Sequence, residues 1–146
     1  MSNSTVIVLI EDNADDELLT KRAFARQKFA NPLVVLRDGA EALDYFFGPD
    51  ASQNIDGRTH LILLDLNLPK VSGIEVLERL RAEPATALFP IVVLTSSDED
   101  SDIREAYKRG VNSYLRKPID FNRFVDVATQ IGLYWLIVNE PPPVAA

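Results

Sequence analysis

The chain has 146 residues, of which 47% are hydrophobic and 25% are charged, a balance typical of one globular domain with room for a real core. Its formal net charge of −7 argues against a nucleic-acid-binding surface, which needs an excess of Lys and Arg. Cysteine is absent, so disulfides and thiolate metal sites are excluded. The apolar run Val6–Ile10 is too short for a signal peptide or a membrane span, so we expect a cytoplasmic protein.

Five short apolar runs alternate with helix-like segments along the chain. The runs are continuously apolar and short, which predicts strands buried on both faces: Thr5–Ile10, Pro32–Arg37, Leu61–Leu64, Pro90–Thr95 and Asn112–Arg116. Helical patterns follow them at about Ala14–Phe29, Gly39–Phe47, Ser72–Glu83, Asp102–Arg109 and Phe121–Asn139. This alternation predicts an α/β protein whose parallel sheet carries helices on both faces. No linker divides the chain, so residues 1–146 are expected to form a single domain.

Two segments outside this pattern carry simpler expectations. Gly48–Arg58 is polar and rich in turn residues, which predicts an exposed loop. His60 precedes the third strand, so we expect it at the opposite end of the sheet from Asp65, as a surface residue. Asp15 and Asp16 are expected to complement the positive end of the first helix, with Asp16 bordering the strand exits.

Polar side chains stand where four of the five strands end. Glu11 and Asp12 follow the first strand, Asp65 follows the third, Thr95 ends the fourth and Lys117 follows the fifth. In open parallel sheets, sites lie outside the carboxyl ends of the strands. We therefore expect three carboxylates, a hydroxyl and an ammonium group to converge at one edge of the sheet.

Three carboxylates this close repel one another unless a cation joins them. Carboxylate, carbonyl and water ligands suit a hard divalent ion, for which Mg²⁺ is the usual choice. A carboxylate beside Mg²⁺, with a lysine and a hydroxyl nearby, is suited to phosphoryl transfer. Asp65 stands alone at a central strand exit and is the best nucleophile, giving an acyl phosphate. Glu11 and Asp12 are adjacent and suit metal binding.

Glu11-Asp12, Asp65, Thr95 and Lys117-Pro118, in this order on a five-fold β/α pattern, resemble the receiver domain of two-component response regulators. The resemblance covers residues 5 to about 138. It implies a flavodoxin-like, doubly wound sheet with strand order 2-1-3-4-5. It also implies that Asp65 accepts a phosphoryl group from a phosphohistidine on a sensor histidine kinase, while Thr95 and Lys117 hold the phosphoryl oxygens.

The same resemblance implies a set of Mg²⁺ ligands. Asp12, Asp65 and the backbone carbonyl of Asn67 would bind the ion directly. Glu11, where the family more often has Asp, would act through water, which its extra methylene still permits.

The resemblance also implies a switch and a backbone conformation near the site. Tyr114 matches the switch aromatic that turns inward as Thr95 moves, although a half-buried strand tyrosine is an equal alternative. The Lys117–Pro118 bond would be cis, which the tertiary amide allows at low cost.

Within the family, the loop Gly48–His60, the run LILLDLNLPK and the Trp-containing C-terminal helix resemble the small single-domain regulators paired with bacterial phytochromes. No output module follows the fifth strand, so signalling would proceed through protein–protein contacts. Such a protein would catalyse only its own phosphorylation and dephosphorylation and would not otherwise be an enzyme.

Three other functions fit parts of the pattern. A haloacid-dehalogenase-like phosphatase also uses an Asp nucleophile and Mg²⁺, but it needs a second Asp where this chain has Asn67, and its metal acids follow the lysine. A degenerate receiver that only binds partners is disfavoured by the complete set of polar residues. A phosphorelay intermediate is not distinguished from an endpoint regulator.

The final helix has two parts with different patterns. Phe124, Val127, Ala128 and Ile131 lie at helical spacing and can cover the sheet. Leu133–Val138 is apolar on every side, and a helix of this kind needs burial all round. Large apolar patches mark interfaces, and Tyr and Trp are typical anchors. We expect residues 133–146 to form a dimerisation segment with the interface residues Tyr134, Trp135, Ile137 and Val138. The alternative is that this end folds back over its own core.

Overall fold

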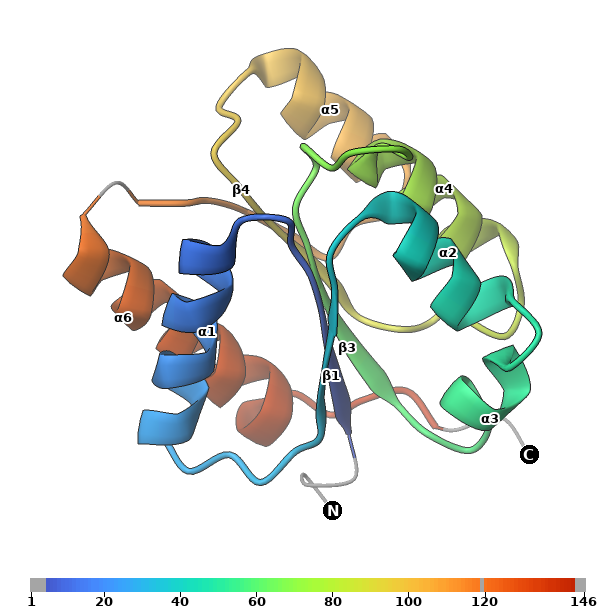
Figure 1. Cartoon of the computed structure of the whole chain (residues 1–146), viewed down its shortest axis with the longest axis horizontal. Helices are drawn as coiled ribbons and strands as arrows, with labels where there is room; N and C mark the ends of the chain where they lie inside the picture. Colours follow the sequence, from blue (N-terminus) through green and yellow to red (C-terminus); the bar gives the residue numbers. More distant parts are fainter. Residues whose placement is uncertain (1–4, 119, 144–146) are drawn as a thin grey trace.

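The computed structural model describes residues 5–118 and 120–143, which form one five-stranded parallel sheet with helices on both faces (Figure 1). The strands are β1 (Val6–Ile10), β2 (Leu33–Leu36), β3 (His60–Leu64), β4 (Ile91–Thr95) and β5 (Ser113–Arg116). The helices are α1 (Ala14–Arg26), α2 (Gly39–Phe47), α3 (Ala51–Ile55), α4 (Gly73–Ala82), α5 (Asp100–Lys108) and α6 (Phe121–Gly132), and a π-helical turn, η2 (Leu133–Val138), follows. The strand order β2-β1-β3-β4-β5 confirms the expected topology.

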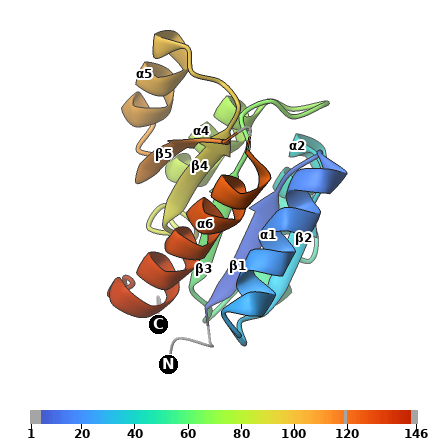
Figure 2. The same cartoon turned by 90° about the vertical axis from the view of Figure 1, so that its left-hand side faces the viewer.

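The sheet separates two hydrophobic cores because successive side chains of a strand point to opposite faces. In β1, Val8 and Ile10 pack with residues of α2 and α4, whereas Ile7 and Leu9 pack with residues of α1 and α6. Figure 2 shows α1 and α6 side by side on one face, with α2 and α4 behind the sheet. Every residue of β1, β3 and β4 is buried, as their continuously apolar sequences predict.

Two expectations about local structure need correction. The segment Gly48–Arg58 is not only a loop, because Ala51–Ile55 forms the short helix α3, whose last residue, Ile55, is buried in the core. The first helix ends at Arg26 rather than Phe29, and Lys28 has a positive φ of 57°. That left-handed conformation turns the chain out of the helix toward β2.

His60 lies at the expected end of the sheet, but the expectation of a surface position is wrong. It is the first residue of β3, and its side chain is completely buried among the rings of Tyr45, Phe46 and Phe89. Its Nδ1 lies 3.2 Å from the carbonyl oxygen of Arg58 and must donate to it, so Nε2 accepts from the hydroxyl of Tyr45 at 3.0 Å. Neutral imidazole therefore satisfies both partners, and burial lowers the pKa of His60 to about 4.

The end of the chain leaves the α-helical path after Gly132. In η2 the N–H of Asn139 donates to the carbonyl oxygen of Tyr134, 2.6 Å away, a bond between residues five apart. Leu136 is buried, whereas Ile137 and Val138 are 58% and 71% exposed. The last three residues of the expected segment 133–146 lie outside the described residues. Within the described ranges, no helix is long and apolar enough to cross a membrane.

The buried imidazole predicts a pH-dependent stability. The folded-state pKa of about 4 lies below the ordinary value of 6.5, so the unfolded chain binds more protons between these values, and stability falls as the pH drops through that window. Relative to His60→Phe, the wild type should lose roughly 2 kcal/mol of unfolding free energy between pH 7 and pH 5. Urea unfolding of both proteins measures this. A constant difference across the pH range would show that His60 does not titrate in this way.

Candidate functional site

The polar residues predicted at the strand exits converge at the carboxyl edge of the sheet. β1 and β3 run in register, with Ile10 opposite Leu64, so Glu11 and Asp65 leave the sheet side by side. The N–H of Asp65 donates to the carbonyl oxygen of Ile10 at 3.1 Å. The N–H of Lys117 donates to the carbonyl oxygen of Thr95 at 2.7 Å, which keeps the end of β5 against β4.

Asp65 is buried, and three donors hold its carboxylate. The hydroxyl of Thr95 donates to Oδ1 at 2.8 Å, and the backbone N–H of Asn67 donates to the same oxygen at 3.0 Å. The ammonium of Lys117 donates to Oδ2 at 2.7 Å. These contacts fix the orientation of the carboxylate in a site that excludes most water.

The loop after Asp65 is held by the first turn of α4. A Cβ on Gly73 would lie 2.5 Å from both the carbonyl oxygen of Asp65 and the Cα of Leu66, so only glycine permits this approach of two backbones. The N–H of Gly73 donates to the carbonyl oxygen of Leu66 at 3.0 Å. Ser72 caps the helix by accepting from the N–H of Glu75.

Lys117 contacts three carboxylates of the site. Its Nζ lies 2.7 Å from Oδ2 of Asp65, 2.7 Å from Oε1 of Glu11 and 2.9 Å from Oδ2 of Asp16. Burial by itself would lower the pKa of Lys117, but the hydrogen bonds to Asp65, Glu11 and Asp16 outweigh it and raise this pKa above its ordinary value. The ammonium therefore stays charged and holds together three carboxylates, which come from the ends of β1 and β3 and from α1.

Glu11 and Asp12 complete an acidic cluster. Carboxylate oxygens of Glu11, Asp12 and Asp65 all lie within 4.8 Å of one another. Glu11 is buried, and that burial raises its pKa to about 7 despite the hydrogen bond from Lys117, whereas Asp12 is exposed. The donor set consists only of oxygens, which suits a hard divalent cation.

Asp16 lies at the strand exits, as expected from the sequence, but its ion pair with Lys117 was not expected. Its position in the first turn of α1 is explained by the helix dipole, so nothing in the pattern required a further partner. It lies one helical turn after Asp12, on the side of α1 that faces the strand exits, and this spacing is the signal that could have found it.

Tyr114 and the bond after Lys117 lie beside this cluster. The side chain of Tyr114 is half-buried, and its hydroxyl donates to the carbonyl oxygen of Ser97 at 3.0 Å. No peptide bond between described residues is cis, so the expectation of a cis Lys117–Pro118 bond is wrong. The trans form remains the lower in energy for an X–Pro bond, and Lys117 reaches all three carboxylates with it.

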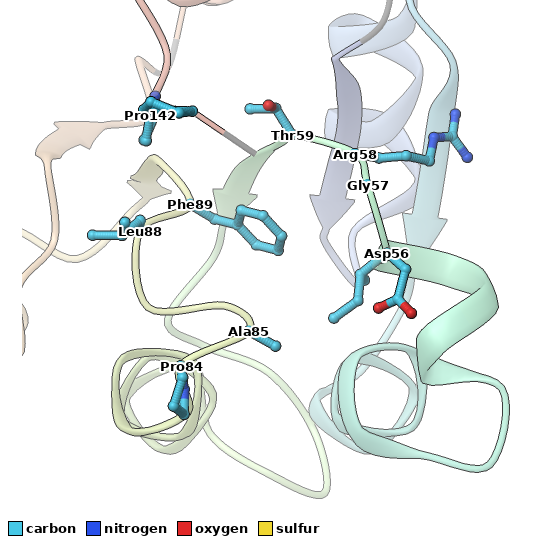
Figure 3. A pocket seen from close by; sticks show the side chains of 11 residues that line it. Asp56, Gly57, Arg58, Thr59, Pro84, Ala85, Leu88, Phe89 and Pro142 are labelled. Carbon is cyan, nitrogen blue, oxygen red and sulfur yellow. The ribbon is translucent and has the colours of Figure 1, made fainter. Parts of the chain in front are cut away.

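A separate cavity of about 430 Å³ lies at the opposite edge of the sheet (Figure 3). Segments before β3 and β4 line it together with Pro142 and Pro143. Leu88 and Phe89 both line it, whereas the side chain of Arg58 extends away from them. The lining is mostly apolar and brings no carboxylate cluster together, unlike the carboxyl edge of the sheet.

Comparison with known proteins identifies the class to which this fold and site belong. Residues 7–129 match the response regulator receiver domain, and the chain belongs to this family. The probable methanogenesis regulatory protein FilR2 of Methanothrix harundinacea is 42% identical over 139 residues, which cover 94% of this chain and 87% of FilR2. The response regulator Rcp1 of Synechocystis is 35% identical over 131 residues, covering 90% of this chain and 88% of Rcp1.

Solved structures that superimpose on this chain are also response regulators. The phosphorylated cyanobacterial phytochrome response regulator RcpA superimposes with a TM-score of 0.86 at 35% identity, covering 94% of this chain and 97% of RcpA. The Mn²⁺-bound form of Rcp1 gives a TM-score of 0.86 at 34% identity, covering 94% of this chain and 98% of Rcp1. Acceptance of a phosphoryl group is the function of this family, and neither the haloacid-dehalogenase-like phosphatase nor the phosphorelay intermediate is favoured.

Proposed function

We propose that Asp65 is the phosphoryl acceptor of this receiver domain. The observation that carries the proposal is the buried carboxylate of Asp65, which Thr95 and Lys117 hold through opposite oxygens. A carboxylate fixed in this way is ready to act as a nucleophile because its orientation needs no further ordering.

The transfer takes the following course. An oxygen of Asp65 forms a bond to the phosphorus of a phosphohistidine on a sensor histidine kinase. The phosphorus–nitrogen bond breaks, its electron pair stays on the imidazole, and that nitrogen takes up a proton. The product is an acyl phosphate. Thr95 and Lys117 then donate hydrogen bonds to the phosphoryl oxygens, where negative charge accumulates.

The acidic cluster fits Mg²⁺. Asp12, Asp65 and the backbone carbonyl of Asn67 would hold the ion directly, and Glu11 would act through water. When bound, the ion neutralises charge on the transferring phosphoryl group. The close oxygens of Glu11, Asp12 and Asp65 support this set, as does the occurrence of a Mn²⁺-bound form of Rcp1.

Phosphorylation would be read through Thr95 and Tyr114. Thr95 now donates to Asp65, and Tyr114 holds the carbonyl of Ser97, two residues further along the same loop. If Thr95 turns to a phosphoryl oxygen, this loop shifts and Tyr114 turns inward. The kinase would be a bacterial phytochrome, a partner suggested by the similarity to RcpA and Rcp1.

The surface of η2 would form a homodimer with the adjoining β5 region. Tyr134, Ile137 and Val138 are 49%, 58% and 71% exposed, and Trp135 is half-buried beside them. Exposed apolar side chains this close together favour a second protein surface. The dimer would give phosphorylation a place to be read by partner proteins.

The first test concerns the acceptor. Incubated with Mg²⁺ and acetyl phosphate, the full chain should gain one acid-stable, base-labile phosphoryl group, measured by intact-mass spectrometry. Asp65→Asn should abolish the gain because an amide is a poor nucleophile. Asp56→Asn, at the far edge of the sheet, is the matched control and should label like the wild type. Full labelling of Asp65→Asn would contradict the assignment.

The second test concerns the metal. Asp12→Ala removes a direct ligand and should raise the Mg²⁺ concentration for half-saturation at least about tenfold, since loss of even outer-shell partners costs ~10–100-fold. It should also stabilise the metal-free protein, because one of three neighbouring carboxylates is gone. Titration of Mg²⁺ followed by NMR measures the affinity, with Asp56→Ala as the control. An unchanged affinity in Asp12→Ala would argue against this cluster.

The third test concerns the dimer. The double variant Ile137→Ser, Val138→Ser should be monomeric at micromolar concentrations where the wild type is dimeric, because it removes the exposed apolar surface. Leu88→Ser, which changes a side chain 70% exposed elsewhere, should leave the dimer intact. Light scattering measures the mass of each, before and after phosphorylation. A wild type that is monomeric in both states would end the proposal.

A further inference from the structure

The three donors of the Lys117 ammonium have three carboxylate acceptors, and one of them lies outside the cluster assigned to metal and phosphoryl binding. Glu11 and Asp65 account for two, at 2.7 Å each. The third is Oδ2 of Asp16, at 2.9 Å. The side chain of Lys117 is only 9% exposed, so little solvent is available to replace a lost carboxylate.

Three consecutive acids lie in the first turn of α1, and they have different surroundings. Asp15 is exposed. Glu17 forms ion pairs with Lys21 and Arg37 instead. Asp16, whose side chain is 22% exposed, is the one that reaches Lys117. Favourable charge at a helix N-terminus would apply to all three, so it does not explain the direction in which Asp16 points.

The start of α1 fixes Asp16 relative to the rest of the site. The side chain of Asn13 accepts from the N–H of Asp16 at 2.9 Å, and the N–H of Asn13 donates to Oε2 of Glu11 at 3.1 Å. One capping residue therefore sets the backbone of Asp16 and the side chain of Glu11 together. Both carboxylates then meet the same ammonium from different sides.

We propose that Asp16 is a positioning residue that holds the Lys117 ammonium against Asp65 and thereby sets the rate of phosphorylation. This inference rests on the proposed role of Asp65 as acceptor. A lysine side chain has several freely rotating bonds and a compact charge without a preferred direction. Contacts from the ends of β1 and β3 and from α1 together hold its Nζ in a single location. The donor for the incoming phosphoryl oxygen is then in place before transfer.

Removal of Asp16 should slow transfer without removing any group that touches the reactants. Loss of a direct donor to a developing charge costs about 100-fold or more. Looser placement of a donor that is still present should cost less. We expect Asp16→Ala to lower the rate of phosphorylation about three- to tenfold. Asp16→Asn keeps an oxygen that can accept from the ammonium, so it should retain at least about half of the wild-type rate.

The experiment measures the rate of phosphorylation by acetyl phosphate at saturating Mg²⁺ for the wild type, Asp16→Ala, Asp16→Asn and Asp15→Ala. Asp15→Ala removes the same charge from the same helical turn and should match the wild type. Equal rates for Asp16→Ala and Asp15→Ala would overturn the proposal. A wild type that does not label would instead contradict the proposed function, so the two failures are distinguishable.

A second measurement tests whether Asp16 acts through Lys117. Urea unfolding of the wild type, Asp16→Ala, Lys117→Met and the double variant forms a double-mutant cycle, which isolates the interaction of the two side chains. We expect Asp16→Ala to destabilise the wild type measurably more than it destabilises Lys117→Met. Additive effects would show that Asp16 does not act through Lys117 and would overturn the proposal.

Discussion

The ion pairs of one largely buried lysine organise the carboxyl edge of the sheet. Lys117 contacts Asp65, Glu11 and Asp16 at 2.7–2.9 Å. Without it, these carboxylates would repel one another in a site largely closed to water. The lysine therefore stabilises a cluster of carboxylates that also suits a divalent cation. Its ammonium lies against the carboxylate of Asp65. In the proposed function, the group that holds the resting site together is also the one that receives the phosphoryl oxygens.

The sheet makes this arrangement possible by bringing distant parts of the chain to one edge. Parallel pairing sends every strand out of the core in the same direction, and the register of β1 with β3 places Glu11 beside Asp65. The close approach of Gly73 then fixes the loop that carries Asn67. Burial of β1, β3 and β4 on both faces gives these exits a rigid base. The polar side chains of the site are thus held by short-range contacts, on a sheet whose position is determined by packing.

The framework and most of the site follow from the sequence because they depend on local signals. Continuous apolar runs predict buried strands, and polar residues directly after them predict the convergence of Asp65, Thr95 and Lys117. Long-range packing explains why some predictions from the sequence were wrong or incomplete. α3 is a single polar turn held by the burial of Ile55 and by a hydrogen bond from the side chain of Asn54 to the carbonyl oxygen of Tyr45. His60 is buried because Phe46 and Phe89 meet over it. Asp16 was expected beside the strand exits, but its contact with Lys117 joins residues about a hundred positions apart, which no local pattern predicts. The trans Lys117–Pro118 bond shows that a family resemblance does not determine each backbone detail.

The central claim is that the carboxylate held by Lys117 and Thr95 is the one that carries the phosphoryl group. Borohydride reduces an aspartyl phosphate to homoserine, so peptide mass spectrometry after reduction locates the acceptor directly. The protein should be treated with Mg²⁺ and acetyl phosphate and then reduced. The account predicts homoserine at position 65 and unmodified aspartate at positions 12 and 16. Homoserine at another aspartate, with Asp65 unmodified in the labelled protein, would contradict it.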